Sequence, residues 1–79
     1  MSARPVKRSL TLHGHRTSVS LEEPFWNEFR RIAEVRGISV NELAGFVDAA
    51  RGMESGLASA IRVFVLEDAL RRGEPISGD

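Results

Sequence analysis

The chain has 79 residues, with eleven basic side chains, eleven acidic side chains and no cysteine. This length allows one domain with a modest core, and the lack of cysteine excludes a disulfide framework and a thiolate zinc site. No stretch approaches the 18 apolar residues of a membrane span, and the basic start lacks the apolar run of a signal peptide, so we expect a cytoplasmic protein without a membrane partner.

The charges are unevenly distributed although the net charge is zero. Residues 1–21 contain no acid and four basic side chains, which are Arg4, Lys7, Arg8 and Arg16. A basic segment of this kind commonly contacts nucleic acid. A solvated, disordered N-terminus has the same composition. We expect residues 1–8 to form a flexible basic arm, in which Lys7 and Arg8 are candidate contacts to DNA phosphate.

Two alternating segments follow the arm. Ser9 to Leu12 is interpreted as an extended lead-in or a short strand of its own, because Gly14 permits a turn or bulge that resets the register. The segment from His15 to Leu21 is the one clear strand. Its two faces differ, with Val19 and Leu21 on the apolar side and Arg16, Ser18 and Ser20 on the polar side.

A lone strand leaves backbone hydrogen-bonding groups unpaired, which costs a folded protein free energy. In so small a chain we expect the partner to be the same strand of a second copy, so that the two form an intermolecular antiparallel ribbon. Its exposed face would carry Arg16, Ser18 and Ser20 twice. A ribbon of that width fits the major groove of DNA, where base edges offer donors and acceptors.

Two helices are predicted after the strand. The first has Pro24 at its start and Gly37 at its end, and its apolar side chains recur on one stripe. The second begins with a capping box, in which Ser39 is the cap and Glu42 lies three residues on. Gly52 is expected to end this second helix.

A third helix is expected from about Gly56 to Arg72, followed by a tail over residues 73–79. Its apolar positions cover too wide an arc for a surface helix packed on one side, which favours burial at a seam between subunits. The predicted fold is therefore mainly α with one N-terminal strand, in a domain over residues 9–72. Its expected dimer core contains Val19, Leu21, Trp26, Phe29, Leu43, Val47, Ile61 and Phe64.

A strand that runs straight into a helix, followed by a glycine turn and a capped second helix, resembles the ribbon-helix-helix family. The matching stretches are Arg16-Thr-Ser-Val-Ser-Leu21 and Gly37-Ile-Ser-Val-Asn-Glu-Leu43, within residues 15–51. The run from Gly14 to Glu22 and the later Leu57 to Leu66 are similar to a subgroup of short bacterial members. The resemblance implies an intertwined homodimer that binds double-stranded DNA, most often as a transcriptional repressor.

The resemblance also implies that Arg16, Ser18 and Ser20 face bases and that the start of the second helix holds phosphate. Elementary chemistry supports both roles. Backbone N–H groups at a helix N-terminus bind anions, so Ser39, Val40 and Asn41 make a plausible phosphate clamp. Arg16 can donate two hydrogen bonds to a guanine edge.

The same sequence leaves one other function open. The alternative is a protein-interaction module or antitoxin-like dimer that engages a protein partner through the third helix. His13 and His15 form a His-x-His pair, but no third ligand is apparent, so neither a metal nor a cofactor is expected. The serines have no His–Asp constellation to activate them, and no phosphate-binding glycine loop appears, so we do not expect an enzyme.

Overall fold

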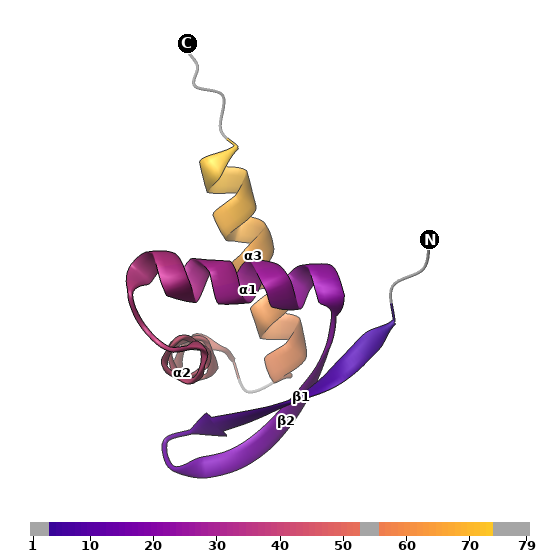
Figure 1. The fold of residues 1–79 in the computed structure, drawn as a ribbon, viewed down its shortest axis with the longest axis vertical. Coiled ribbons are helices and arrows are strands. Elements are labelled where there is room, and N and C mark those ends of the chain that lie inside the picture. The colour runs from indigo at the N-terminus through magenta and orange to yellow at the C-terminus, as the bar shows by residue number, and fades with distance from the viewer. Residues whose placement is uncertain (1–3, 53–55, 74–79) are drawn as a thin grey trace.

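The computed structural model describes residues 4–52 and 56–73, which form a β-hairpin followed by three helices (Figure 1). The elements are β1 (Pro5–Leu12), β2 (His15–Glu22), α1 (Glu23–Arg36), α2 (Val40–Ala50) and α3 (Leu57–Arg72). All three helices lie on one side of the hairpin, and α3 runs from beside the hairpin to the opposite end of the molecule. Within the described ranges, none of these helices has the length and apolar character needed to cross a membrane.

The two strands pair with each other inside one chain. A two-residue turn joins them, with φ of 51° at His13 and 82° at Gly14. Positive φ at both central residues is typical of the tight hairpin turn whose twist matches the flanking strands. The strand β2 therefore has a partner within its own chain, so the prediction of a lone strand is wrong. Pairing of strands between two copies stays a prediction. Residues 5–8, predicted as part of a flexible arm, belong to β1, and residues 1–3 of that predicted arm lie outside the described residues.

The register of the hairpin explains why the apolar residues of the two segments have opposite parity. Leu10 pairs with Thr17 and Arg8 pairs with Val19 across the ribbon. Directly paired residues point to the same face of a sheet, so the even residues of β1 join the odd residues of β2. This arrangement brings Leu10 and Leu12 onto the face that also buries Val19 and Leu21.

The first helix ends and the second helix begins where the sequence predicts. Gly37 terminates α1 in the left-handed conformation, with φ of 72°, and its N–H bonds to main-chain carbonyls of α1. At the start of α2 the Glu42 N–H donates to Ser39 Oγ at 3.0 Å, and the Ser39 N–H donates to Glu42 Oε1 at 2.9 Å. This reciprocal pair confirms the predicted capping box. The third helix is likewise confirmed, as a separate element after α2 ends at Ala50.

One hydrophobic core forms within the single chain. Its buried side chains come from the hairpin and all three helices: Leu10, Leu12, Val19, Leu21, Phe29, Ile32, Ala33, Leu43, Ala44, Val47, Ile61 and Val65. Six of the eight residues expected in a dimer core belong to this set, and Trp26 and Phe64 pack against it partly buried. Most of the residues predicted for a dimer core are thus already buried within the single chain, and their part in a dimer stays a prediction.

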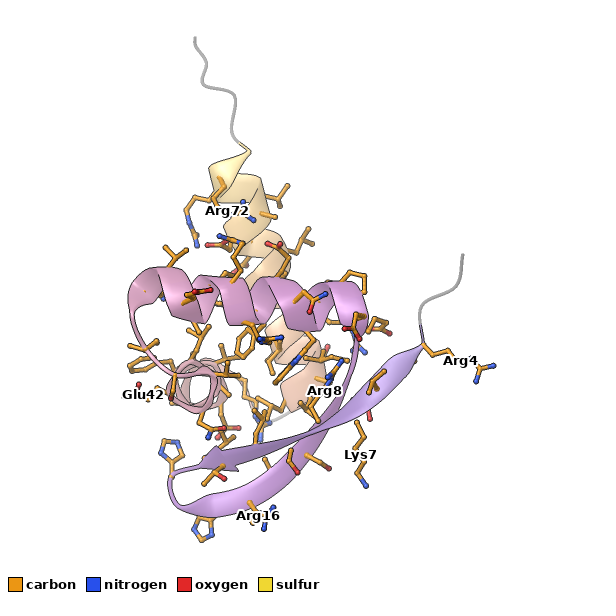
Figure 2. The ribbon with its side chains drawn as sticks, in the orientation of Figure 1. Arg4, Lys7, Arg8, Arg16, Glu42 and Arg72 are labelled. Atoms are coloured by element: carbon orange, nitrogen blue, oxygen red, sulfur yellow. The ribbon has the colours of Figure 1, made fainter. Side chains whose placement is uncertain are left out.

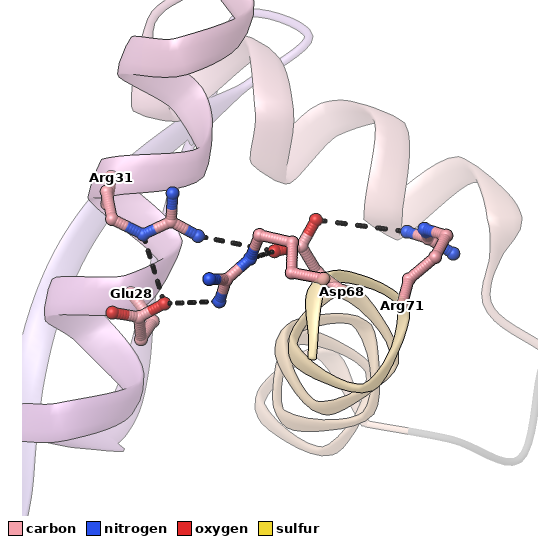
Figure 3. A network of polar contacts seen from close by, with 5 residues as sticks. Glu28, Arg31, Asp68 and Arg71 are labelled. Carbon is pink, nitrogen blue, oxygen red and sulfur yellow. Dashed lines mark hydrogen bonds and ion pairs between the residues drawn. The ribbon is translucent and has the colours of Figure 1, made fainter. Parts of the chain in front are cut away.

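Charged side chains tie the C-terminal half of α3 to α1 (Figure 3). Asp68 accepts a hydrogen bond from Arg72 Nε at 2.8 Å and one from Arg31 at 3.3 Å. Glu28 accepts one from each of the same two arginines, both at 3.1 Å. The hydrogen bond from Arg72, together with the neighbouring positive charges, lowers the pKa of Asp68 despite its partial burial.

Candidate nucleic-acid interface

The face of the hairpin that points away from the helices is entirely polar over six residues, and we call it the outer face. These residues are Lys7, Ser9 and Thr11 of β1 and Arg16, Ser18 and Ser20 of β2, and all six are exposed. Figure 2 shows the side chains of Lys7 and Arg16 directed away from the helical layer. The outer face therefore offers two cations and four hydroxyl groups on a two-stranded ribbon.

Strand pairing fixes how these groups are spaced. Lys7 lies opposite Ser20, and Arg16 lies opposite Thr11, with Ser9 and Ser18 paired between them. Lys7 and Thr11 are four positions apart, and Arg16 lies opposite Thr11, so the two cations lie about 13 Å apart along the ribbon at 3.3 Å per residue. Hydroxyl groups fill the space between them. The outer face can therefore form hydrogen bonds with a polyanion that presents both donors and acceptors along one edge.

The next residue on this face is an acid whose charge is already paired. Glu22 Oε1 accepts a hydrogen bond from Arg62 Nε at 2.9 Å, and this bond lowers the pKa of Glu22. Arg62 also donates to the Ser20 carbonyl oxygen at 3.3 Å. Arg62 of α3 thus holds the end of β2 in place, and its positive charge pairs with the carboxylate of Glu22 beside the outer face.

Arg8 lies on the opposite face, although it follows Lys7 directly. Successive residues of a strand alternate between faces, so Arg8 points toward α1 (Figure 2). It forms an ion pair with Glu23 at 2.8 Å, and its guanidinium lies 5.2 Å from the centre of the Trp26 ring. Of the two basic residues predicted to contact phosphate, Lys7 therefore lies on the outer face, whereas Arg8 links the hairpin to α1.

The first turn of α2 lies beside β1. Asn41 Oδ1 accepts a hydrogen bond from the Thr11 main-chain N–H at 3.0 Å, across thirty residues of sequence. Ser39 and Asn41 are exposed and Val40 is half-buried. The predicted phosphate clamp and the outer face are consequently neighbours, joined by one hydrogen bond between Asn41 and the strand that carries Thr11.

Sequence reasoning missed two residues of the outer face, Ser9 and Thr11. The signal that identifies them is the His13-Gly14 dipeptide between two alternating segments, since a two-residue turn ending in glycine is a strong sign of a hairpin. A hairpin of that register places Ser9 and Thr11 on the same face as Arg16. Because the parity of this segment differs from that of β2, its alternation alone predicts an extended lead-in or a separate short strand.

The two histidines lie in the hairpin turn and directly after it. His13 lies in the turn itself, with its ring next to Gly45 of α2, and His15 is the first residue of β2. Among residues 4–52 and 56–73, no group of three or more histidine, cysteine or acidic side chains is arranged to hold a metal ion.

Comparison with known proteins gives one match. A family model described as the ribbon-helix-helix domain matches residues 5–69, which span the whole hairpin, α1, α2 and most of α3. Neither a curated protein nor a solved structure matches the chain.

Proposed function

Because the chain belongs to the ribbon-helix-helix family, whose members generally bind DNA and regulate transcription, we propose that it is a sequence-specific repressor that binds double-stranded DNA. The outer face of the hairpin carries this proposal. A two-stranded ribbon fits the major groove, where each base pair presents a distinct pattern of donors and acceptors. The outer face presents an arginine and four hydroxyl groups to such a pattern.

Within this proposal the side chains divide into base contacts and phosphate contacts. Arg16 donates two hydrogen bonds to the O6 and N7 atoms of a guanine, and Ser18 and Ser20 contact neighbouring base edges. Lys7 neutralises a phosphate at the other end of the ribbon. These assignments agree with the paired positions of the four residues on a single exposed face.

The start of α2 provides a second set of phosphate contacts. Main-chain N–H groups in the first turn of a helix attract anions. Asn41 uses its Oδ1 atom to hold the Thr11 N–H, and its Nδ2 group is the donor that we assign to phosphate. Contacts of this kind position a protein on the duplex without carrying sequence information.

The experiment that tests this function measures binding to a random-sequence duplex at low and moderate salt. Phosphate contacts make the affinity fall steeply as salt rises. Ser18→Glu, which puts an acid at the centre of the outer face, is expected to abolish binding. Asn27→Glu makes the same charge change at an exposed residue of α1 and should bind like the wild type. Absence of wild-type binding at low salt would contradict the proposal.

A further inference from the structure

A groove lies between α2 and the turn end of the hairpin, and we call it the turn groove (Figure 1). Thr11 and His13 form its hairpin side, and residues of α2 from Asn41 to Ala49 form its other side. The hydrogen bond from the Thr11 N–H to Asn41 Oδ1, at 3.0 Å, joins the two sides. The groove has a volume of about 460 Å³, which lies within the range of about 300–1,000 Å³ that is typical of small-molecule sites.

Two residues of α2 at the turn groove are unusual for a surface helix. Gly45 lies inside the helix, where glycine is less favourable than alanine. A Cβ atom at Gly45 would lie 3.7 Å from the His13 ring, so the missing side chain leaves space beside that ring. Phe46 follows directly, and its large apolar side chain is 63% exposed. Departures from local preference concentrate at functional sites, and both of these line the same groove.

Glu42 gives the turn groove a negative charge that no neighbour balances. Its Oε1 atom accepts the Ser39 N–H at 2.9 Å in the capping box, which leaves Oε2 without a hydrogen bond to any described residue. Among residues 4–52 and 56–73, Glu42 forms no salt bridge, and no lysine or arginine lines the groove. A cation therefore complements this site, and an anion would be repelled from it.

We propose that the turn groove binds a small aromatic amine. The ammonium group pairs with Glu42 Oε2, and the aromatic ring packs against Phe46 in the space beside Gly45. Two aromatic rings in contact gain more free energy than their buried area alone provides, and a ring face also attracts a cation. The mostly apolar lining thus holds the body of the ligand, and the single carboxylate fixes its orientation.

The location of the turn groove connects the amine to DNA binding, and this step rests on the proposed function. Glu42 lies in the first turn of α2, directly after Asn41, to which we assign a phosphate contact. A carboxylate at this position repels phosphate, and a bound ammonium group cancels that charge. The amine should therefore strengthen DNA binding at low salt by about two- to fivefold, the effect of one unit charge at about 4–8 Å in water.

NMR titration of the isotope-labelled protein with phenethylamine tests the site. The dissociation constant of so small a probe is expected to be on the order of 1 mM, with the largest amide shift changes at His13, Gly45 and Phe46. Phenylacetate carries the same ring with the opposite charge, and ethylamine carries the same charge without the ring. Absence of saturable changes with phenethylamine, or equal binding of phenylacetate or ethylamine, would overturn the proposal.

Two variants test the assigned contacts. Glu42→Gln keeps an oxygen that accepts the Ser39 N–H and should weaken phenethylamine binding about tenfold, because a hydrogen bond to a charged group is lost. Glu34→Gln makes the same change at an exposed residue of α1 and should bind like the wild type. Phe46→Leu keeps an apolar side chain without the ring and should also weaken binding. Wild-type affinity in Glu42→Gln or Phe46→Leu would overturn the proposal.

DNA binding gives a readout that a purely structural role of Glu42 would not produce. Phenethylamine should tighten binding of the wild type to a random duplex, with ethylamine at the same concentration as the control for added salt. Glu42→Gln should bind DNA more tightly than the wild type without amine and should not respond to phenethylamine. An unchanged affinity of the wild type with bound phenethylamine would overturn this regulatory step.

The outcomes separate this inference from the proposed function. A wild-type protein that binds the duplex but not phenethylamine overturns the amine site and leaves the function standing. A protein that binds phenethylamine in the turn groove but no duplex at low salt supports the site and contradicts the function.

Discussion

At the scale of single residues, the two cations of the outer face are expected to make different contacts with DNA. Arg16→Ala should weaken binding to a preferred sequence by about 1–3 kcal/mol and relax the preference at one base pair. Lys7→Ala should weaken binding to all sequences alike and lower the salt slope by about one. Both side chains are exposed, so thermal unfolding should be unchanged. Equal loss of stability and binding in Arg16→Ala would show that Arg16 is structural.

Asn41 allows a nearly isosteric test of the phosphate contact. Asn41→Asp keeps the oxygen that accepts from the Thr11 N–H and replaces the amide donor with a negative charge. An acid in the first turn stabilises a free helix by about 0.3–1 kcal/mol, so thermal stability should be equal or slightly higher. Binding measured on several duplexes should weaken to a similar degree on each. Wild-type affinity at low salt would show that the start of α2 does not lie at the DNA backbone.

At the scale of elements, α2 contains a glycine that its surroundings do not require. A Cβ atom built on Gly45 meets the His13 ring at 3.7 Å, an ordinary van der Waals distance. Glycine inside a helix costs about 1 kcal/mol relative to alanine. Gly45→Ala should therefore raise the melting temperature by about 4–8 °C, measured by circular dichroism. A lower melting temperature would mean that the contact between the turn and α2 is tighter than the structure indicates.

The link between α1 and α3 makes stability depend on pH in a defined direction. Since the arginines hold the pKa of Asp68 below its usual value of 3.8, its stabilising effect is present above that value and is lost as the pH falls through the lower folded pKa. Asp68→Asn should lower the melting temperature at neutral pH, and the difference from wild type should shrink in acid. Glu34→Gln, at an exposed residue of α1, is the control. A difference that stays constant down to about pH 3 would contradict this role.

The elements differ in how far the sequence predicts them. The helix ends follow from local signals, such as the Ser39 and Glu42 capping box and Gly37 in the left-handed conformation. The first strand does not follow from local signals, because Arg8 occupies an inward position and interrupts the apolar alternation. The inward position of Arg8 depends on its contacts with Glu23 and Trp26, which lie on another element. The contact between Asn41 and Thr11 likewise cannot be predicted from local sequence patterns, since its partners are thirty positions apart in the sequence.

At the scale of the whole molecule, the hairpin and the three helices close one core within a single chain. This packing leaves the outer face of the hairpin exposed. The ribbon that we propose for the major groove is complete in each copy, and dimerisation would add a second ribbon.

The most direct test of the central claim is NMR mapping of backbone amide shifts on addition of a duplex at low salt. We predict that the largest changes fall on β1 and β2, at the outer-face residues from Lys7 to Ser20, and on the first turn of α2. Residues on the far side of α1, such as Val35, should change little. Changes concentrated on α1 and α3, with the hairpin unaffected, would contradict the claim that the outer face of the hairpin binds DNA.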